Sequence, residues 1–126
     1  MTKAAGLQRK VEYGLLSAFY GPLLTERQRI LLRLYCDEDY SLGEVANQLG
    51  VSRQGISDGL QRAYERLDEL ETLLGLQRQF SDMRRVMQLS HQAIEGALTK
   101  HPELTALSEA RDALDAFMKT EEADGL

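Results

Sequence analysis

Apolar residues recur along this chain at spacings of three and four, which is the period of one face of an α-helix. Six segments show this pattern, and no stretch alternates apolar and polar residues as a half-buried strand would. The predicted helices cover residues 9–20, 25–36, 42–48, 52–74, 76–98 and 102–119. The fold class that we expect is therefore all-α.

Residues that start and stop helices set the limits of these segments. The apolar stripe of Val11, Leu15 and Phe19 predicts a short first helix that begins near residue 9. Gly75 interrupts the stripe of the fourth helix, so we expect a bend or a break there. Pro102 suits the first position of the last helix, because that position needs no backbone N–H.

Residues 41–56 have the spacing of a helix-turn-helix. Ser41 and Glu44 form a capping box at the start of the first helix, and Ser52 caps the second. Ala46 is small where the two helices cross, and Gly50 can adopt the positive φ of the turn. Apolar residues should clamp the two helices together, namely Val45, Leu49, Val51, Ile56 and Leu60. Several independent requirements are met in order, which makes this motif the strongest signal in the sequence.

The second helix of the motif offers a polar face if Ile56, Leu60 and Ala63 point to the core. A recognition helix presents the side chains of its first turns to base edges and phosphates, and its free N–H groups attract anions. The candidate nucleic-acid-binding residues are Ser52, Arg53, Gln54, Ser57, Asp58, Gln61 and Arg62. Asp58 either accepts from a cytosine amino group or pairs with Arg62. A solvated face or a protein contact is the alternative interpretation of the whole surface.

Gly55 and Gly59 are unusual inside a helix, where each costs about 1 kcal/mol relative to alanine. They predict close approach of the backbone to a neighbour or a ligand. With Ser57 they also match the G-x-S-x-G pattern of serine hydrolases, but that elbow needs a buried strand before the serine and a larger α/β scaffold. His91 and His101 lack a Glu or Cys at the spacing of a metal site. We therefore expect no catalytic residue, no metal, no cofactor and no enzyme activity.

Charge is distributed unevenly along the 126 residues, which carry a formal net charge of −5. Residues 1–66 hold nine basic and eight acidic side chains, whereas residues 67–126 hold six and twelve. The acidic run 37–39 is expected to be a solvated turn and not a cation site. A near-neutral head, residues 1–66, can bind a polyanion locally, and an acidic arm, residues 67–126, opposes it.

Features that target a chain to a membrane or to an oxidising compartment are missing from the sequence. The N-terminus has no apolar run of signal-peptide length, and no stretch approaches the roughly 18 apolar residues of a membrane span. The lone Cys36 excludes an internal disulfide. We therefore expect a cytoplasmic protein. The apolar stripes of the arm are too long for the head to cover, so we expect a homodimer, with antiparallel folding of residues 76–98 and 102–119 as the other solution.

The run from Leu23 to Asp58 resembles the YlxM family, small bacterial helix-turn-helix proteins encoded beside the signal recognition particle GTPase. The matching residues are Leu23-Leu24-Thr25, Gln28, Leu34-Tyr35, Asp39, Ser41-Leu42-Gly43-Glu44-Val45-Ala46 and Val51-Ser52-Arg53-Gln54, with Asp58 and Arg62 further on. The family is similar in turn to the promoter-reading fourth region of sigma factors. Gly55 and Ser57 depart from the pattern, where an alanine and a larger side chain are common.

This resemblance implies a helix-turn-helix head like sigma region four, followed by a long helical arm. It implies a nucleic-acid-binding regulatory protein of the signal recognition particle pathway, with promoter-like DNA, the particle's RNA and its GTPases as partners. The alternative is a protein-interaction adaptor that docks on a targeting GTPase or a ribosomal partner and reads no nucleic acid.

Overall fold

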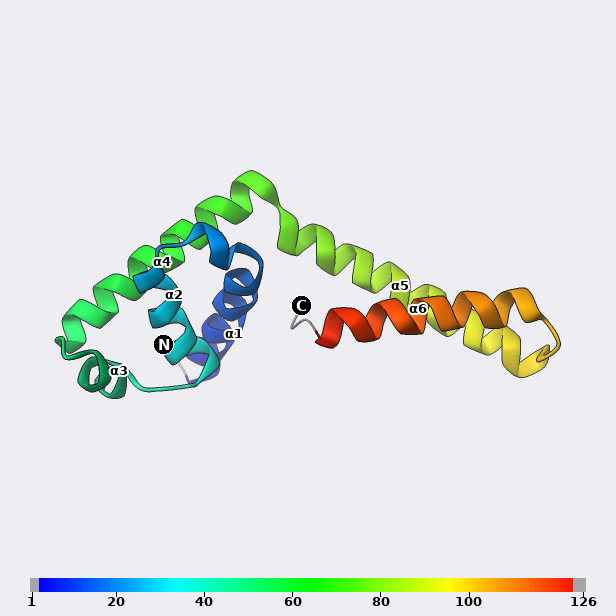
Figure 1. The fold of residues 1–126 in the computed structure, drawn as a ribbon, viewed down its shortest axis with the longest axis horizontal. Helices are drawn as coiled ribbons and strands as arrows, with labels where there is room; N and C mark the ends of the chain where they lie inside the picture. Colours follow the sequence, from blue (N-terminus) through cyan, green and yellow to red (C-terminus); the bar gives the residue numbers. More distant parts are fainter. Residues whose placement is uncertain (1–2, 124–126) are drawn as a thin grey trace. The chain divides into compact units, whose positions relative to one another are not determined.

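The computed structural model describes residues 3–123, with side chains for residues 6–119, and this part of the chain is helical without any strand. The all-α prediction is confirmed (Figure 1). The helices are α1 (Lys3–Tyr20), α2 (Glu26–Leu32), α3 (Leu42–Leu49), α4 (Arg53–Leu74), α5 (Leu76–Lys100) and α6 (Thr105–Ala123), with a 3₁₀ turn η1 (Gly21–Leu23) and a π-helical turn η2 (Arg33–Asp37). Two compact units result, an N-terminal unit (Met1–Gln77) and a C-terminal unit (Arg78–Leu126).

The core of the N-terminal unit is built along α4, which buries residues from its first turn to its fifth. Thirteen side chains form this core: Tyr20, Leu24, Leu31, Leu32, Leu34, Val45, Ala46, Ile56, Leu60, Ala63, Tyr64, Leu67 and Leu70. They come from α1, α2, α3, η2, α4 and the loop before α2. The unit reaches past residue 66, because Leu67 and Leu70 are buried in the same cluster.

Helix α1 differs from its prediction in length and in part of the face that it buries. It begins at Lys3 and not near residue 9, since residues 3–8 contain no proline and mostly good helix formers. Val11 and Leu15 of the predicted apolar stripe are 56% and 45% exposed, whereas Phe19 of the same stripe packs against the core. The buried face also carries Tyr20, with Tyr13 half-buried beside it.

The break at Gly75 is confirmed, and side chains stabilise it. Gly75 has φ 62, and its N–H donates to the carbonyl of Glu71. Tyr20 donates its hydroxyl proton to Oε1 of Glu71 at 2.6 Å and accepts from the backbone N–H of Leu76 at 3.0 Å. The same Glu71 oxygen accepts from the N–H of Gln77 at 3.1 Å. These bonds satisfy N–H groups that the first turn of α5 would otherwise leave without partners.

The C-terminal unit is an antiparallel pair of helices, in which α6 returns along α5 (Figure 1). Helix α6 begins at Thr105 and not at Pro102, because residues 101–104 form a turn closed by a hydrogen bond from Leu104 to the carbonyl of His101. Leu98, which is 8% exposed, is the one buried side chain among those described in this unit. Half-buried apolar residues line the same seam, namely Met87, Ile94, Leu107, Leu114 and Met118.

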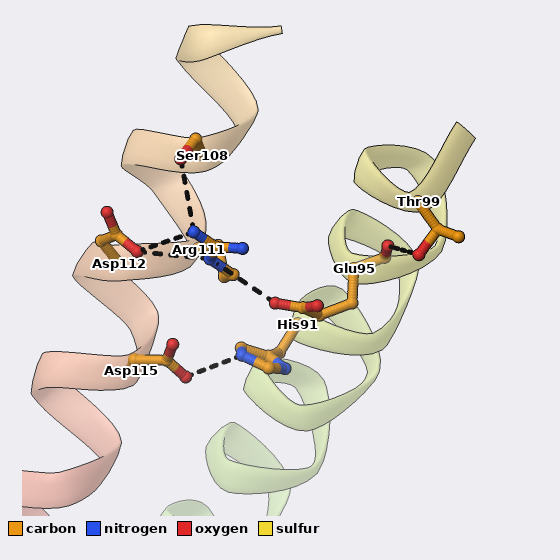
Figure 2. A network of polar contacts seen from close by, with 7 residues as sticks. All are labelled: His91, Glu95, Thr99, Ser108, Arg111, Asp112 and Asp115. Carbon is orange, nitrogen blue, oxygen red and sulfur yellow. Dashed lines mark hydrogen bonds and ion pairs between the residues drawn. The ribbon is translucent and has the colours of Figure 1, made fainter. Parts of the chain in front are cut away.

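Two contacts between polar side chains cross this seam (Figure 2). Nε2 of His91 lies 2.7 Å from Oδ1 of Asp115, and Nε of Arg111 lies 3.5 Å from Oε1 of Glu95. Glu95 lies four residues after His91 on α5, and its partner Arg111 lies four residues before Asp115 on α6. Both pairs therefore fit one antiparallel register. In the described part of the chain, no helix has both the length and the hydropathy needed to cross a membrane.

Candidate nucleic-acid interface

Local hydrogen bonds define both helices of the helix-turn-helix. Ser41 Oγ accepts from the N–H of Glu44, and the carboxylate of Glu44 accepts from the N–H of Ser41, each at 3.1 Å. Gly50 ends α3 with φ 68, and Ser52 then caps α4 by accepting from the N–H of Gly55 at 3.0 Å. The predicted capping box, turn glycine and second cap are therefore all confirmed.

Apolar contacts hold α3 against α4 as the motif requires. Val45 and Ala46 of α3 are buried, as is Ile56 of α4, and Ala46 leaves room for the crossing helix. Val51 is an exception, because it is 39% exposed and lies outside the core cluster. The Val51 N–H donates to the carbonyl of Ala46, and the Val51 side chain is only partly covered by the two helices.

The polar face of α4 is exposed over its first three turns. The residues buried on the opposite side of α4 include Ile56, Leu60 and Ala63, as predicted. All seven candidate residues are exposed and share one surface: Ser52, Arg53, Gln54, Ser57, Asp58, Gln61 and Arg62. We call this surface the recognition face. Cations, amides and hydroxyls are all available there, which are the groups that contact phosphates and base edges.

Two of the recognition-face residues pair with each other in a way that the sequence did not predict. Nε2 of Gln54 donates to Oδ1 of Asp58 at 2.9 Å. No ion pair joins Asp58 to Arg62 among the side chains that the structure describes, so the expected pairing of these two is wrong. The amide of Gln54 donates to the carboxylate of Asp58, and the guanidinium of Arg62 stays exposed to solvent.

The guanidinium of Arg53 lies over Gly43 of α3. A Cβ atom at Gly43 would stand 2.7 Å from Nη2 of Arg53, closer than real Cβ contacts, and 3.1 Å from its Nε. The absence of a side chain at Gly43 therefore permits the observed position of Arg53. The sequence predicted no role for Gly43, although a glycine inside a helix is itself a signal that another group approaches the backbone closely.

The two glycines of α4 have different surroundings. A Cβ at Gly59 would lie 2.7 Å from Cδ1 of the buried Leu31, so the predicted close approach to a neighbour is confirmed there. At Gly55 the nearest atom is the capping Oγ of Ser52, at 3.2 Å, and the residue is exposed. Gly55 therefore adds exposed backbone to the first turn of α4, next to its cap.

Helix α1 contributes a residue to this surface that sequence analysis did not identify. Nη2 of Arg9 donates to Oε1 of Gln61 at 3.3 Å, across 52 positions in the chain. Its guanidinium carbon lies 4.8 Å from the ring centroid of Tyr64 and 5.7 Å from that of Tyr13. These rings stack on each other with centroids 4.0 Å apart. Burial raises the pKa of both tyrosines above the ordinary value, so at neutral pH they are uncharged platforms for the cation.

Groups that would indicate a metal or a nucleophile are arranged differently from such sites. Ser57 lies on the outer face of a helix and not on a strand-to-helix elbow. Within the described residues, no three His, Cys, Asp or Glu side chains gather as metal ligands do. Asp37, Glu38 and Asp39 form an exposed turn, in which Asp39 pairs with Lys10 at 2.8 Å.

Comparison with known proteins places the chain in a family. Residues 7–107 match a family model described as UPF0122, "Putative helix-turn-helix protein, YlxM / p13 like". A UPF0122 protein of Halalkalibacterium halodurans is 37% identical over 109 residues, which cover 86% of this chain and 99% of that protein. A UPF0122 protein of Symbiobacterium thermophilum is 41% identical over 103 residues, 82% of this chain and 89% of that protein.

A further relative matches more strongly over a shorter region. A UPF0122 protein of Acetivibrio thermocellus is 47% identical over 74 residues, which cover 59% of this chain and 63% of that protein. The family match extends over α2, α3 and α4 and so includes the whole recognition face. The chain therefore belongs to the UPF0122 family of YlxM- and p13-like helix-turn-helix proteins.

Proposed function

We propose that this protein is a nucleic-acid-binding regulator of the signal recognition particle pathway, whose recognition face contacts promoter-like DNA or the particle's RNA. The observation that carries the proposal is the recognition face itself. Seven polar side chains stand exposed on the first turns of the second helix of a helix-turn-helix, while the opposite side of that helix is buried. A helix positioned in this way can present those side chains to nucleic acid.

The residues of the recognition face would contact different parts of the nucleic acid according to their position on α4. Arg53 and Gln54 stand in the first turn of α4 and Gln61 two turns later, where forked or bidentate side chains can read base edges. Arg62 would hold a backbone phosphate, since its guanidinium is exposed and Asp58 is paired with Gln54. Ser52 and the N–H groups behind it would add an anion-attracting helix end.

In this proposal the head at residues 1–66 recognises nucleic acid and the arm at residues 67–126 mediates dimerisation or docking. A pair of helices with one buried side chain among those described is too small to be stable alone, because short units rarely bury enough apolar surface. Met83, Val86 and Leu89 of α5 are 49%, 56% and 58% exposed, at successive steps of three. A second copy of the chain would cover them, giving the homodimer that we propose.

The same exposed residues support a second candidate function. An apolar strip on an acidic arm is also what a protein-docking surface would offer. In this alternative the protein is an adaptor that binds a targeting GTPase or a ribosomal partner without reading nucleic acid. The two candidates differ in whether the recognition face is needed for binding.

Titrations at several salt concentrations test the proposal. Wild type, Arg53→Ala and Arg62→Ala are titrated against promoter-like duplexes and signal recognition particle RNA. Arg53→Ala should cost about 1–3 kcal/mol and relax sequence preference, whereas Arg62→Ala should weaken all ligands similarly and reduce the salt slope by about one. If neither variant differs from wild type while the particle's GTPases still co-purify with both, the adaptor replaces the regulator.

A further inference from the structure

A hollow of about 180 Å³ opens beside the recognition face, between the first half of α1 and the second and third turns of α4. Two residues of the recognition face, Ser57 and Gln61, form one side of it. The other side carries cations and aromatic rings from α1, η2 and α4. The polar and aromatic residues that line it are Arg9, Lys10, Tyr35, Ser57, Gln61 and Tyr64.

Arg9 is fixed in place within this hollow. Its guanidinium lies over the ring of Tyr64, whose partner in stacking is Tyr13, and one of its N–H groups donates to Gln61. A guanidinium carries five N–H donors, so this arrangement orients the group while most of its donors stay available. No carboxylate among the described side chains pairs with Arg9.

Nearby acidic groups are already engaged with other partners. Oδ2 of Asp68 accepts from the hydroxyl of Tyr13 at 2.8 Å, and Oε1 of Glu65 accepts from the amide of Gln61 at 3.3 Å. Lys10 lies 4.2 Å from the ring centroid of Tyr35 and pairs with Asp39, which is not among the lining residues. The lining therefore contains two cations, three side chains with a hydroxyl and one amide, and no carboxylate.

We propose that this hollow binds a backbone phosphate of the nucleic acid, with the guanidinium of Arg9 as its main donor and the hydroxyl of Ser57 as a second. The inference rests on the proposed function. Gln61 lies eight residues beyond Arg53, about 12 Å along the helix axis at 1.5 Å per residue. The major groove is about 8.5 Å deep, so a helix whose first turn reaches the bases meets the phosphates near this level. Arg9 thus extends the interface from the helix-turn-helix onto α1.

Fluorescence anisotropy titrations of the full-length protein test this assignment. Wild type, Arg9→Ala and Arg9→Lys are compared at several salt concentrations with the duplex or RNA that wild type binds best. Arg29→Ala is the matched control, because it removes one exposed positive charge of the same unit outside the hollow. Melting followed by circular dichroism establishes that each variant is folded.

Arg9→Ala should weaken binding about tenfold, the effect of losing a charge-assisted hydrogen bond, and should lower the salt slope by about one without changing sequence preference. Arg9→Lys should restore the slope and only part of the affinity, because it keeps the charge and loses the fork. Arg29→Ala should retain the wild-type slope. If wild type binds and Arg9→Ala keeps the wild-type slope and affinity, the phosphate site is wrong and the proposed function stands. Failure of wild type to bind any nucleic acid would overturn both.

Discussion

At the scale of single residues, Gly43 and Gly59 show how one residue type serves two purposes in this motif. Gly59 lets α4 approach α2, since a Cβ there would meet a buried leucine. Gly43 instead leaves space for the end of a long polar side chain, the guanidinium of Arg53. The first contact belongs to the core and the second to the recognition face, so substitution should separate stability from binding.

Gly59→Ala should destabilise the protein by about 1–2 kcal/mol, because overpacking against Leu31 outweighs the gain in helix propensity. Gly43→Ala should leave stability unchanged or raise it by up to about 1 kcal/mol, since Arg53 can move aside. Gly43→Ala should nevertheless weaken nucleic-acid binding, because the added Cβ displaces the guanidinium of Arg53. Urea unfolding gives the stabilities and anisotropy the affinities. Equal stability losses in the two variants would refute this distinction.

The buried tyrosines make the fold sensitive to high pH. Burial, and hydrogen bonds to Glu71 and Asp68, raise the pKa of Tyr20 and Tyr13 above the ordinary value near 10. A folded-state pKa raised above the unfolded value stabilises the fold fully below about pH 10 and loses that contribution as the pH rises through the folded pKa. Ionised Tyr20 would also face the carboxylate of Glu71 at hydrogen-bond distance.

We therefore expect unfolding to begin above pH 10, with part of the phenolate absorbance appearing only together with the loss of helicity. Spectrophotometric titration and circular dichroism on the same samples check this. Tyr20→Phe, which retains the ring and removes the ionisable hydroxyl, should shift the alkaline transition to higher pH. A transition unchanged by that substitution would show that Tyr20 is not one of the groups responsible.

At the scale of elements, sequence reasoning succeeded where local chemistry decides and failed where tertiary contacts decide. The caps of α3 and α4 and the left-handed Gly50 and Gly75 depend on neighbouring residues, so their patterns were sufficient. The apolar stripe predicted for α1 was only partly right: Phe19 packs against the core, but so do Tyr13 and Tyr20, whose rings the predicted stripe did not include. Val11 and Leu15 of that stripe are exposed.

The candidate site was predictable to a similar extent. The recognition face followed from the helical wheel of α4, since its buried residues fix which others are exposed. Arg9 could not be found in this way, because only the fold brings α1 beside Gln61. Its signal in the sequence was limited to a cation and an aromatic residue one helical turn apart, a spacing that occurs on many solvated helices.

Polar contacts link α5 to α6 in addition to the apolar seam (Figure 2). His91 and Asp115 are 24% and 44% exposed, so their coupling should amount to about 0.2–1 kcal/mol. A double-mutant cycle of His91→Ala and Asp115→Ala, read by hydrogen exchange in α5 and α6, measures it. The exposed pair His101 and Glu103 is the matched control, whose coupling should be indistinguishable from zero. Equal coupling in both cycles would mean that the first pair does not specify the register.

At the scale of the whole molecule, the proposed dimer follows from how little the C-terminal unit buries. Sedimentation equilibrium at tens of micromolar should give twice the chain mass of 14.2 kDa. Leu89→Glu should shift the equilibrium toward monomer, because it places a charge in the proposed interface. Leu23→Glu, at an exposed leucine of the head, should leave the mass unchanged. A clean monomer for wild type would contradict the dimer.

The central claim is that the recognition face binds nucleic acid, and mapping the bound surface tests it most directly. Uniformly ¹⁵N-labelled protein is titrated with promoter-like duplex and, separately, with signal recognition particle RNA, and backbone amide shifts are followed in two-dimensional spectra. The largest changes should fall within residues 52–62, with smaller ones around Arg9. Spectra that do not change with either ligand, or changes confined to residues 78–119, would contradict the account.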